Sequence, residues 1–346
     1  METTESIKLL KGVREIHYGD PSAECFIGSV IAVMDYLNDP IEVDELFALS
    51  GAGLCFPWKE YSSCDEISII PELSYRTFEA LGYPIEYIYE PDIHSGSRIH
   101  SKEFYLKKII ESIDMNRPVI GFGFTNVDPF ACVITGYDLS RERLYFRAYW
   151  EPAENLNGNQ TDTDYYCADD WYDNCYGIVV VHEQERNRVR GIEAYNYIVE
   201  NAKILKNIYS IHSQGKTIFL QSHAFDAMIQ WLLNDEEWVE LDKNQEVYVI
   251  PCGVLLLAEY RRYLYDYFIK LSKNNPNLVD ANVFSIIEAL SNCIGGEDNS
   301  FHLEKINSEI KEFEMFKDRS VREKVAAFIE KLKAYDESLF NCLIKN

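Results

Sequence analysis

Cys25 is the residue of this sequence that is best placed for covalent chemistry, because it lies where a loop gives way to a helical pattern. Asp20 is a residue type that caps helices, and Pro21 suits a first helical position, where its missing N–H would have no partner. We therefore expect a helix from about Pro21 to Asn38, with Cys25 in its first turn. The positive end of a helix dipole lowers the pKa of such a thiol and favours the nucleophilic thiolate. The alternative interpretation is a small buried side chain, since most free cysteines pack as apolar residues.

A thiol that attacks an acyl carbon needs a histidine to relay the proton, a group that orients this histidine, and a donor for the oxyanion. His17 lies shortly before Cys25 and is our candidate for the base. His182 and His223 are alternatives, because triads recur in different chain orders and distant residues meet in a fold. Each of these histidines also fits an ordinary surface or partly packed position.

Hydrophobic periodicity predicts the elements that must position these residues. Before residue 185, the pattern predicts helices at 40–49, 66–82 and 101–115, and strands at 85–89, 118–124, 130–138, 144–150 and 177–181. The three strands between 118 and 150 are separated by turn residues, so we expect an antiparallel meander. The glycine-rich aromatic segment 51–58 is expected to form a tight turn and a short extended piece beside the cysteine helix.

The pattern changes from about residue 183, where helical periodicity becomes dominant. It predicts helices at 192–208, 224–233, 254–271, 282–293 and 304–332, without a convincing strand. We place a domain boundary in the charged run 183–190. The sequence thus predicts an α+β fold, with a domain of helices packed on an antiparallel sheet over residues 1–185 and an all-α domain over residues 186–346.

Composition limits the classes of function. A chain of 346 residues is long enough for two domains, since single cores stop growing near ~250–300 residues. The formal charge of −24 argues against nucleic-acid partners, which need a cationic surface, and would suit a cationic small molecule or a basic partner. No window approaches the ~20 consecutive apolar residues of a membrane span, and a signal-peptide layout is missing, so we expect no membrane partner and a cytoplasmic location.

The nine cysteines are scattered and include no CxxC pair, which favours reduced thiols over a zinc site or a disulfide framework. The acidic cluster within 162–173 lacks the glycine and the terminal glutamate of a calcium loop. We interpret this cluster as a solvated loop and expect neither a metal site nor a cofactor.

These features together resemble the papain-like cysteine-peptidase superfamily, specifically the bacteriocin-processing peptidases and the N-terminal domain of butirosin-biosynthesis H-type proteins. The resemblance covers the first 185 residues and depends on Glu24-Cys25 opening a helix, on the segment 50–58, and on 118–120 leading to 133–138. It implies a papain-like fold with Cys25 as the nucleophile. The helical half is similar to the C-terminal region of such proteins through 224–232 and 257–261.

The sequence departs from the pattern of the family at two catalytic positions. The family's histidine opens the strand that ends in Thr-Gly-Tyr-Asp, and Phe130 stands there instead. The position of the oxyanion glutamine falls on Gly19, whereas Glu151, before a proline, matches the carboxylate. We therefore expect impaired catalysis by Cys25, Glu151 and His17. A binding site is expected to be lined by the aromatic side chains of Phe130, Trp58, Phe56 and Tyr18.

Three functions follow as hypotheses. The first is a catalytically impaired papain-like protein that serves as a binding or accessory module in peptide or secondary-metabolite biosynthesis. The second is a Cys25-dependent acyltransferase or hydrolase that acts on a peptide, a thioester or an amine-bearing, cationic small molecule. The third is binding of a carrier or partner protein by the helical domain, where aromatic residues crowd one helix. The substrate and the oligomeric state stay open.

Overall fold

A computed structural model describes residues 6–59, 70–94, 96, 98–124, 131–149, 165–238, 249–295 and 316–345. The chain divides into two compact units. The first unit consists of Met1–Leu46, Glu66–Arg188 and Ser213–Gly215, and the second unit consists of Phe47–Asp65, Val189–His212 and Lys216–Asn346. Helix α2 (Val43–Ser50) crosses this division.

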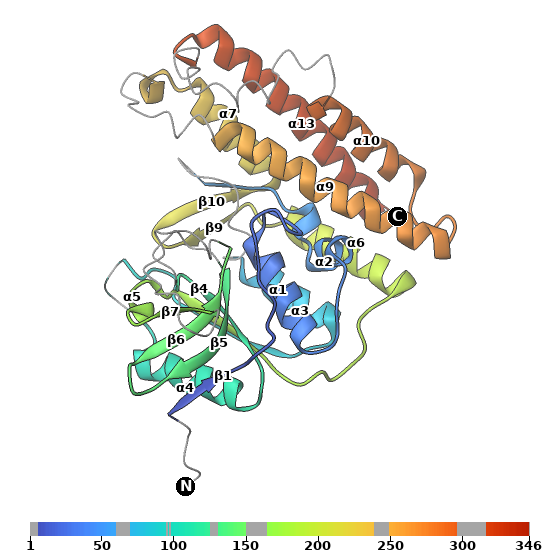
Figure 1. The fold of residues 1–346 in the computed structure, drawn as a ribbon. Helices are drawn as coiled ribbons and strands as arrows, with labels where there is room; N and C mark the ends of the chain where they lie inside the picture. Colours follow the sequence, from blue (N-terminus) through green and yellow to red (C-terminus); the bar gives the residue numbers. More distant parts are fainter. Residues whose placement is uncertain are drawn as a thin grey trace. The chain divides into compact units, whose positions relative to one another are not determined.

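The first unit is built on a seven-stranded antiparallel sheet in which the strands follow the order β3-β8-β4-β5-β6-β7, with β1 paired to β5 (Figure 1). The strands are β1 (Ile7–Leu9), β3 (Ile85–Tyr89), β4 (Val119–Phe122), β5 (Ala131–Asp138), β6 (Arg143–Arg147), β7 (Tyr166–Ala168) and β8 (Gly177–Val181). The predicted meander is confirmed, because β4 pairs with β5 and β5 with β6, both antiparallel. Strand β8 lies between β3 and β4, so a late segment of the unit joins two early ones.

Helices cover this sheet where the sequence supplies an apolar face. They are α1 (Cys25–Tyr36), α3 (Pro71–Leu81), α4 (Lys102–Asp114) and the short α5 (Trp171–Asn174). Helix α1 packs on β4 and β5, and α4 packs on β1, β4, β5 and β8. Residues 25–34 of α1 are all buried, which is why this helix has almost no polar side chains over that stretch.

The second unit is mainly helical. Its helices are α6 (Gly191–Lys206), α7 (Gln221–Leu233), α9 (Val249–Asn274), α10 (Ala281–Gly295) and α13 (Arg319–Lys345), with short 3-10 turns η1 (Ala52–Leu54) and η3 (Asp235–Trp238). Helix α13 packs along α7, α10 and α6, as Figure 1 shows for the long helices. Among the described residues, no helix has the length and the apolar character that crossing a lipid bilayer requires.

The prediction of an all-α second half is wrong in one segment. Strands β9 (Ser210–Ser213) and β10 (Lys216–Leu220) form a sheet with β2 (Pro57–Lys59), in the order β2-β10-β9. The connecting residues Gln214 and Gly215 both have positive φ, at 49° and 72°, as tight hairpin turns require. These strands carry little local signal because they are short, and β10 pairs with a segment that lies far away in sequence.

A buried cation organises the second unit. Arg261 on α9 is fully buried, and its Nε and Nη2 donate to Oδ1 of Asp336 on α13 at 2.8 and 2.6 Å. Its Nη1 and Nη2 also donate to the carbonyl oxygens of Gly53 and Leu54 at 2.6 and 3.0 Å. One guanidinium group therefore joins α9 to α13 and to the end of η1, and its charge is neutralised where water has no access.

Replacing Asp336 by Ala would leave this guanidinium charge buried without its carboxylate. We expect Asp336→Ala to lower the free energy of unfolding by about 3–5 kcal/mol, as for other broken buried ion pairs, measured by urea unfolding. Glu323→Ala is the matched control on the same helix, because it removes an exposed carboxylate that pairs with Arg319. The control should change stability far less. Equal losses in the two variants would contradict the organising role of the buried pair.

Candidate functional site

The candidate site is the start of α1. Cys25 is the first residue of this helix, and Glu24 is its N-cap, with a carboxylate Oε1 that accepts a hydrogen bond from the Phe26 N–H at 3.3 Å. The sequence-based prediction that the helix begins at Pro21 and is capped by Asp20 is wrong. A glutamate cap replaces the expected aspartate cap because the chain turns once more before the helix starts.

This turn is held by hydrogen bonds within residues 17–24. The Asp20 N–H donates to the carbonyl oxygen of His17 at 3.1 Å, and the Gly19 N–H donates to that of Ser22 at 3.0 Å. The hydroxyl of Ser22 accepts a hydrogen bond from the Glu24 N–H at 2.9 Å. The turn therefore delivers Glu24 to the helix end with its carboxylate directed back over the first N–H groups.

The sulfur of Cys25 is buried, with 2% of the residue exposed. The Ala131 N–H, at the start of β5, donates to Sγ at 3.2 Å. On the other side, Sγ lies 4.0 Å from Oε1 of Glu24. The first residue of the buried helix thus contacts the first residue of a central strand, directly beside position 130 in the sequence.

Tyr149, which follows β6 in the sequence, contacts the turn before α1. Its hydroxyl lies 2.9 Å from the carbonyl oxygen of Ser22 and 2.6 Å from that of Glu24, so it donates to the turn that precedes the helix. A Cβ at Gly28 would lie 2.7 Å from the ring and hydroxyl of Tyr149, so only glycine fits there. Tyr18, which is 52% exposed, contacts Tyr149 edge-on with ring centres 6.2 Å apart.

The electrostatics of the thiol combine two opposing influences. The Ala131 N–H and the positive end of α1 favour a thiolate, because both direct partial positive charge at the sulfur. The Glu24 carboxylate disfavours the thiolate for two reasons. Its negative Oε1 lies 4.0 Å from Sγ, and it accepts the hydrogen bond of the Phe26 N–H at the helix end that would otherwise stabilise the sulfur. The arrangement is therefore that of a packed thiol whose ionisation the Glu24 carboxylate opposes.

The other predicted site residues have different surroundings. His17 places Nε2 3.2 Å from the Glu15 carboxylate, and its side chain is 48% exposed. The alternative base His182 accepts a hydrogen bond from Arg117 through its carbonyl oxygen at the end of β8. Phe130 and Glu151, which were predicted for the binding site and the carboxylate, lie outside the described residues.

Two of the four aromatic residues predicted to line the site, Phe56 and Trp58, belong to the second unit. Phe56 stacks on Phe225 with ring centres 4.2 Å apart, and Trp58 lies 5.8 Å from Trp231. Phe56 and Trp58 are each only 1% exposed. Both side chains therefore pack in the core of the second unit, between the segment that contains β2 and helix α7. The alternative base His223 also lies in this unit, where its ring contacts Tyr209 edge-on at 4.7 Å.

A second polar cluster in the first unit was missed from sequence. Glu90 follows β3 and is fully buried, and its carboxylate accepts hydrogen bonds from the N–H groups of Ile99 and His100 at 2.6 and 2.9 Å. It also accepts from Nδ1 of His100 at 2.9 Å and from the Tyr105 hydroxyl at 3.2 Å. Burial by itself would raise the pKa of Glu90, but the hydrogen bonds from Ile99 and His100 outweigh it and lower this pKa.

This cluster fixes a loop and orients an imidazole. Glu90 ties the residues just before α4 back to the end of β3, and His100 stacks on Phe104 with ring centres 4.6 Å apart. A carboxylate at Nδ1 sets the tautomer and direction of the ring, as it does for many histidine bases. The available sequence signal was an acidic residue directly after a predicted strand, which did not identify its partner.

The lowered pKa of Glu90 gives a pH-dependent contribution to stability. This contribution is present above the unfolded-state pKa of about 4.3 and is lost as the pH falls through the lower folded-state value. We expect Glu90→Gln to reduce the free energy of unfolding at pH 7 on the order of 1–3 kcal/mol, because an amide cannot accept all four bonds. The difference between the variant and the parent protein should shrink below about pH 4 in urea unfolding. Glu142→Gln, at a position whose side chain is 73% exposed, is the control.

Comparison of the sequence with known protein families and curated proteins identifies no relative. The sequence matches no protein-family model, and no curated protein is significantly similar to it.

Proposed function

We propose that the first unit is a papain-like domain that binds a peptide or small molecule instead of hydrolysing it, as an accessory module in peptide or secondary-metabolite biosynthesis. The observation that carries this proposal is the hydrogen bond from the Ala131 N–H to Cys25 Sγ at 3.2 Å. It joins a helix that begins with cysteine to the strand that ends in Thr-Gly-Tyr-Asp, as the papain-like resemblance implies.

The charge at the helix end supports binding over catalysis. A catalytic thiol at a helix N-terminus needs the positive end of the helix for its thiolate. In this protein the Glu24 carboxylate takes that position by capping the Phe26 N–H. The burial of Cys25 supports the same conclusion, because a sulfur that is shielded by its surroundings cannot meet an acyl carbon without movement of the neighbouring residues.

Binding would use the aromatic side chains at the helix start. Tyr18 presents about half of its surface to solvent and is braced by Tyr149, whose hydroxyl is fixed on the turn before α1. A half-exposed aromatic side chain that is braced in this way is suited to packing against the apolar part of a ligand. The strongly acidic composition favours a cationic ligand over an anionic one.

The Ala131 N–H also favours a second candidate function. This donor stabilises negative charge on Sγ and would assist a Cys25-dependent acyltransferase or hydrolase that uses an unconventional base. The two functions differ in the reactivity of the thiol, and one measurement separates them.

We expect Cys25 to react with iodoacetamide more slowly than the partly exposed Cys342 at every pH up to 8, when both peptides are quantified by mass spectrometry. Replacing Glu24 by Gln removes the opposing charge and should raise the rate at Cys25 about tenfold, because one neighbouring charge shifts a thiol by about one pKa unit. Glu15→Gln is the control, because it removes an exposed carboxylate that pairs with His17 and Arg147 and does not cap α1. Cys25→Ser identifies the modified peptide.

The opposite result would favour the acyltransferase or hydrolase. In that case Cys25 would react rapidly below pH 7, and His17→Ala would abolish this reactivity. An unchanged rate in Glu24→Gln would remove the electrostatic argument for a binding module.

A further inference from the structure

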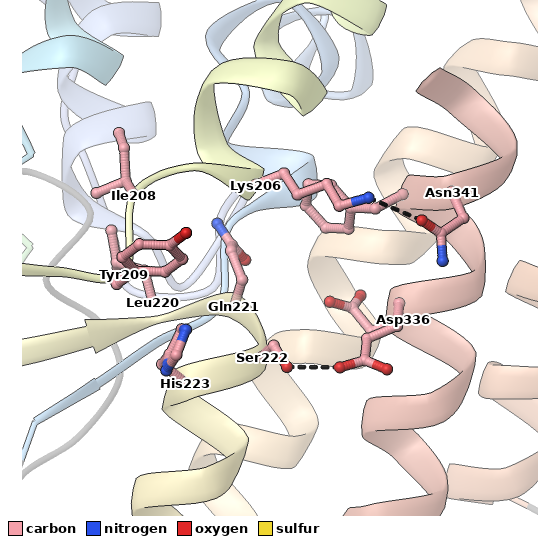
Figure 2. A pocket seen from close by; sticks show the side chains of 11 residues that line it. Lys206, Ile208, Tyr209, Leu220, Gln221, Ser222, His223, Asp336 and Asn341 are labelled. Atoms are coloured by element: carbon pink, nitrogen blue, oxygen red, sulfur yellow. Dashed lines mark hydrogen bonds between the residues drawn. The ribbon is translucent and has the colours of Figure 1, made fainter. Parts of the chain in front are cut away.

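The second unit contains a cavity of about 260 Å³ between the end of α6, the start of α7 and the last turns of α13 (Figure 2). A cavity that holds one water molecule needs only about 10–15 Å³, so this cavity has room for a small organic molecule. All of its lining residues belong to the second unit. It is independent of Cys25 and its neighbours.

Gln221 provides the first indication of a ligand. It is 6% exposed and lines the cavity, and its Oε1 accepts a hydrogen bond from the Phe56 N–H at 3.1 Å. This bond fixes the amide, and Nε2 has no hydrogen-bond partner among the described residues. A buried N–H donor without an acceptor is costly, so an oxygen atom of a bound molecule is its natural partner.

The backbone of Gln221 strengthens this interpretation. Its φ of 53° lies in the left-handed region, which non-glycine residues rarely adopt. The backbone N–H of Gln221 donates to the carbonyl oxygen of Phe56 at 2.9 Å, so the strained conformation is held in place. Strain that is retained to aim one side chain is typical of ligand sites.

Carboxylates from α13 provide the second indication. Asp336 is 2% exposed and lines the cavity, and both of its hydrogen bonds from Arg261 are accepted by Oδ1. Glu337 follows it and accepts a hydrogen bond from the Ser222 hydroxyl at 2.5 Å. Burial raises the pKa of Asp336, while Arg261 opposes this change. An ammonium group in the cavity would be attracted to the Glu337 carboxylate and to Asp336, which already accepts the hydrogen bonds from Arg261.

A donor group lies on another side of the cavity. Figure 2 shows Lys206 above Gln221, and Asp336 on α13 to the right of Gln221. The Lys206 ammonium donates to Oδ1 of Asn341 at 2.8 Å, so it is held at the rim. The apolar surface comes from the buried side chains of Leu220 and Phe340. The cavity thus offers donors, carboxylates and an apolar wall in one small volume.

We propose that this cavity binds a free α-amino acid with an apolar side chain. The carboxylate of the amino acid accepts hydrogen bonds from Gln221 Nε2 and Lys206, and its ammonium group lies against Asp336 and Glu337. The side chain of the amino acid packs on Leu220 and Phe340. This function concerns a site in the second unit and goes beyond the binding function proposed for the first unit.

The test uses the full-length protein and three probes in isothermal titration calorimetry at pH 7. L-Phenylalanine carries both charged groups, phenethylamine lacks the carboxylate, and N-acetyl-L-phenylalanine lacks the ammonium charge. We expect L-phenylalanine to bind at least tenfold more tightly than either analogue, because each analogue loses hydrogen bonds between charged groups. Equal affinities for all three probes, or no binding of L-phenylalanine at about 10 mM, would overturn the proposal.

The variant Gln221→Glu keeps the oxygen that accepts from the Phe56 N–H and replaces only the Nε2 donor. It should weaken L-phenylalanine binding about tenfold or more, whereas phenethylamine binding stays the same or becomes tighter. Glu200→Gln on α6 is the control, because Glu200 pairs with Lys203 and does not line the cavity. Circular dichroism verifies that each variant is folded. Unchanged L-phenylalanine affinity in folded Gln221→Glu would overturn the proposed role of the amide.

Discussion

Charge that is removed from water must be met by hydrogen bonds, and this constraint determines the arrangement of each unit. In the second unit, Arg261 can be buried only because Asp336 and the carbonyl groups at the end of η1 surround its guanidinium group. In the first unit, Glu90 can be buried only because backbone and side-chain donors converge on it from the segment before α4. Glu24 uses the same principle at the end of a helix. Each of these groups fixes a loop that hydrophobic packing alone would leave undetermined.

The same constraint separates the roles that we propose for the two units. At the start of α1, the capping carboxylate of Glu24 satisfies the helix end and thereby takes from Cys25 the electrostatic support that a nucleophile would need. At the cavity of the second unit, the polar requirements are met only in part, since the amide nitrogen of Gln221 has no acceptor among the described residues. A capped helix end favours a thiol that is not a nucleophile, and an unpaired buried donor favours binding of a small ligand.

Local patterning predicted much of the fold. The strand at 85–89, the helix over 101–115 and the antiparallel meander are all confirmed, because the alternation of apolar residues determines the type of an element. The parts that were missed depend on distant partners. Gln221 and Phe56 are 165 residues apart, and strand β10 exists only where β2 can pair with it. No property of either segment alone indicates such a contact. The glutamate cap of α1 was missed because the preceding turn made a closer cap available.

Gly28 is the fourth residue of the buried helix α1, and glycine is less favourable in a helix than any other residue except proline. Because Gly28 has no side chain, it leaves space for the ring of Tyr149, whose hydroxyl donates to the turn before the helix. The two positions are far apart in sequence, yet neither can be enlarged or reduced by itself without a clash or a void. Substitutions at positions 28 and 149 would therefore have to occur together for the start of α1 to keep its shape.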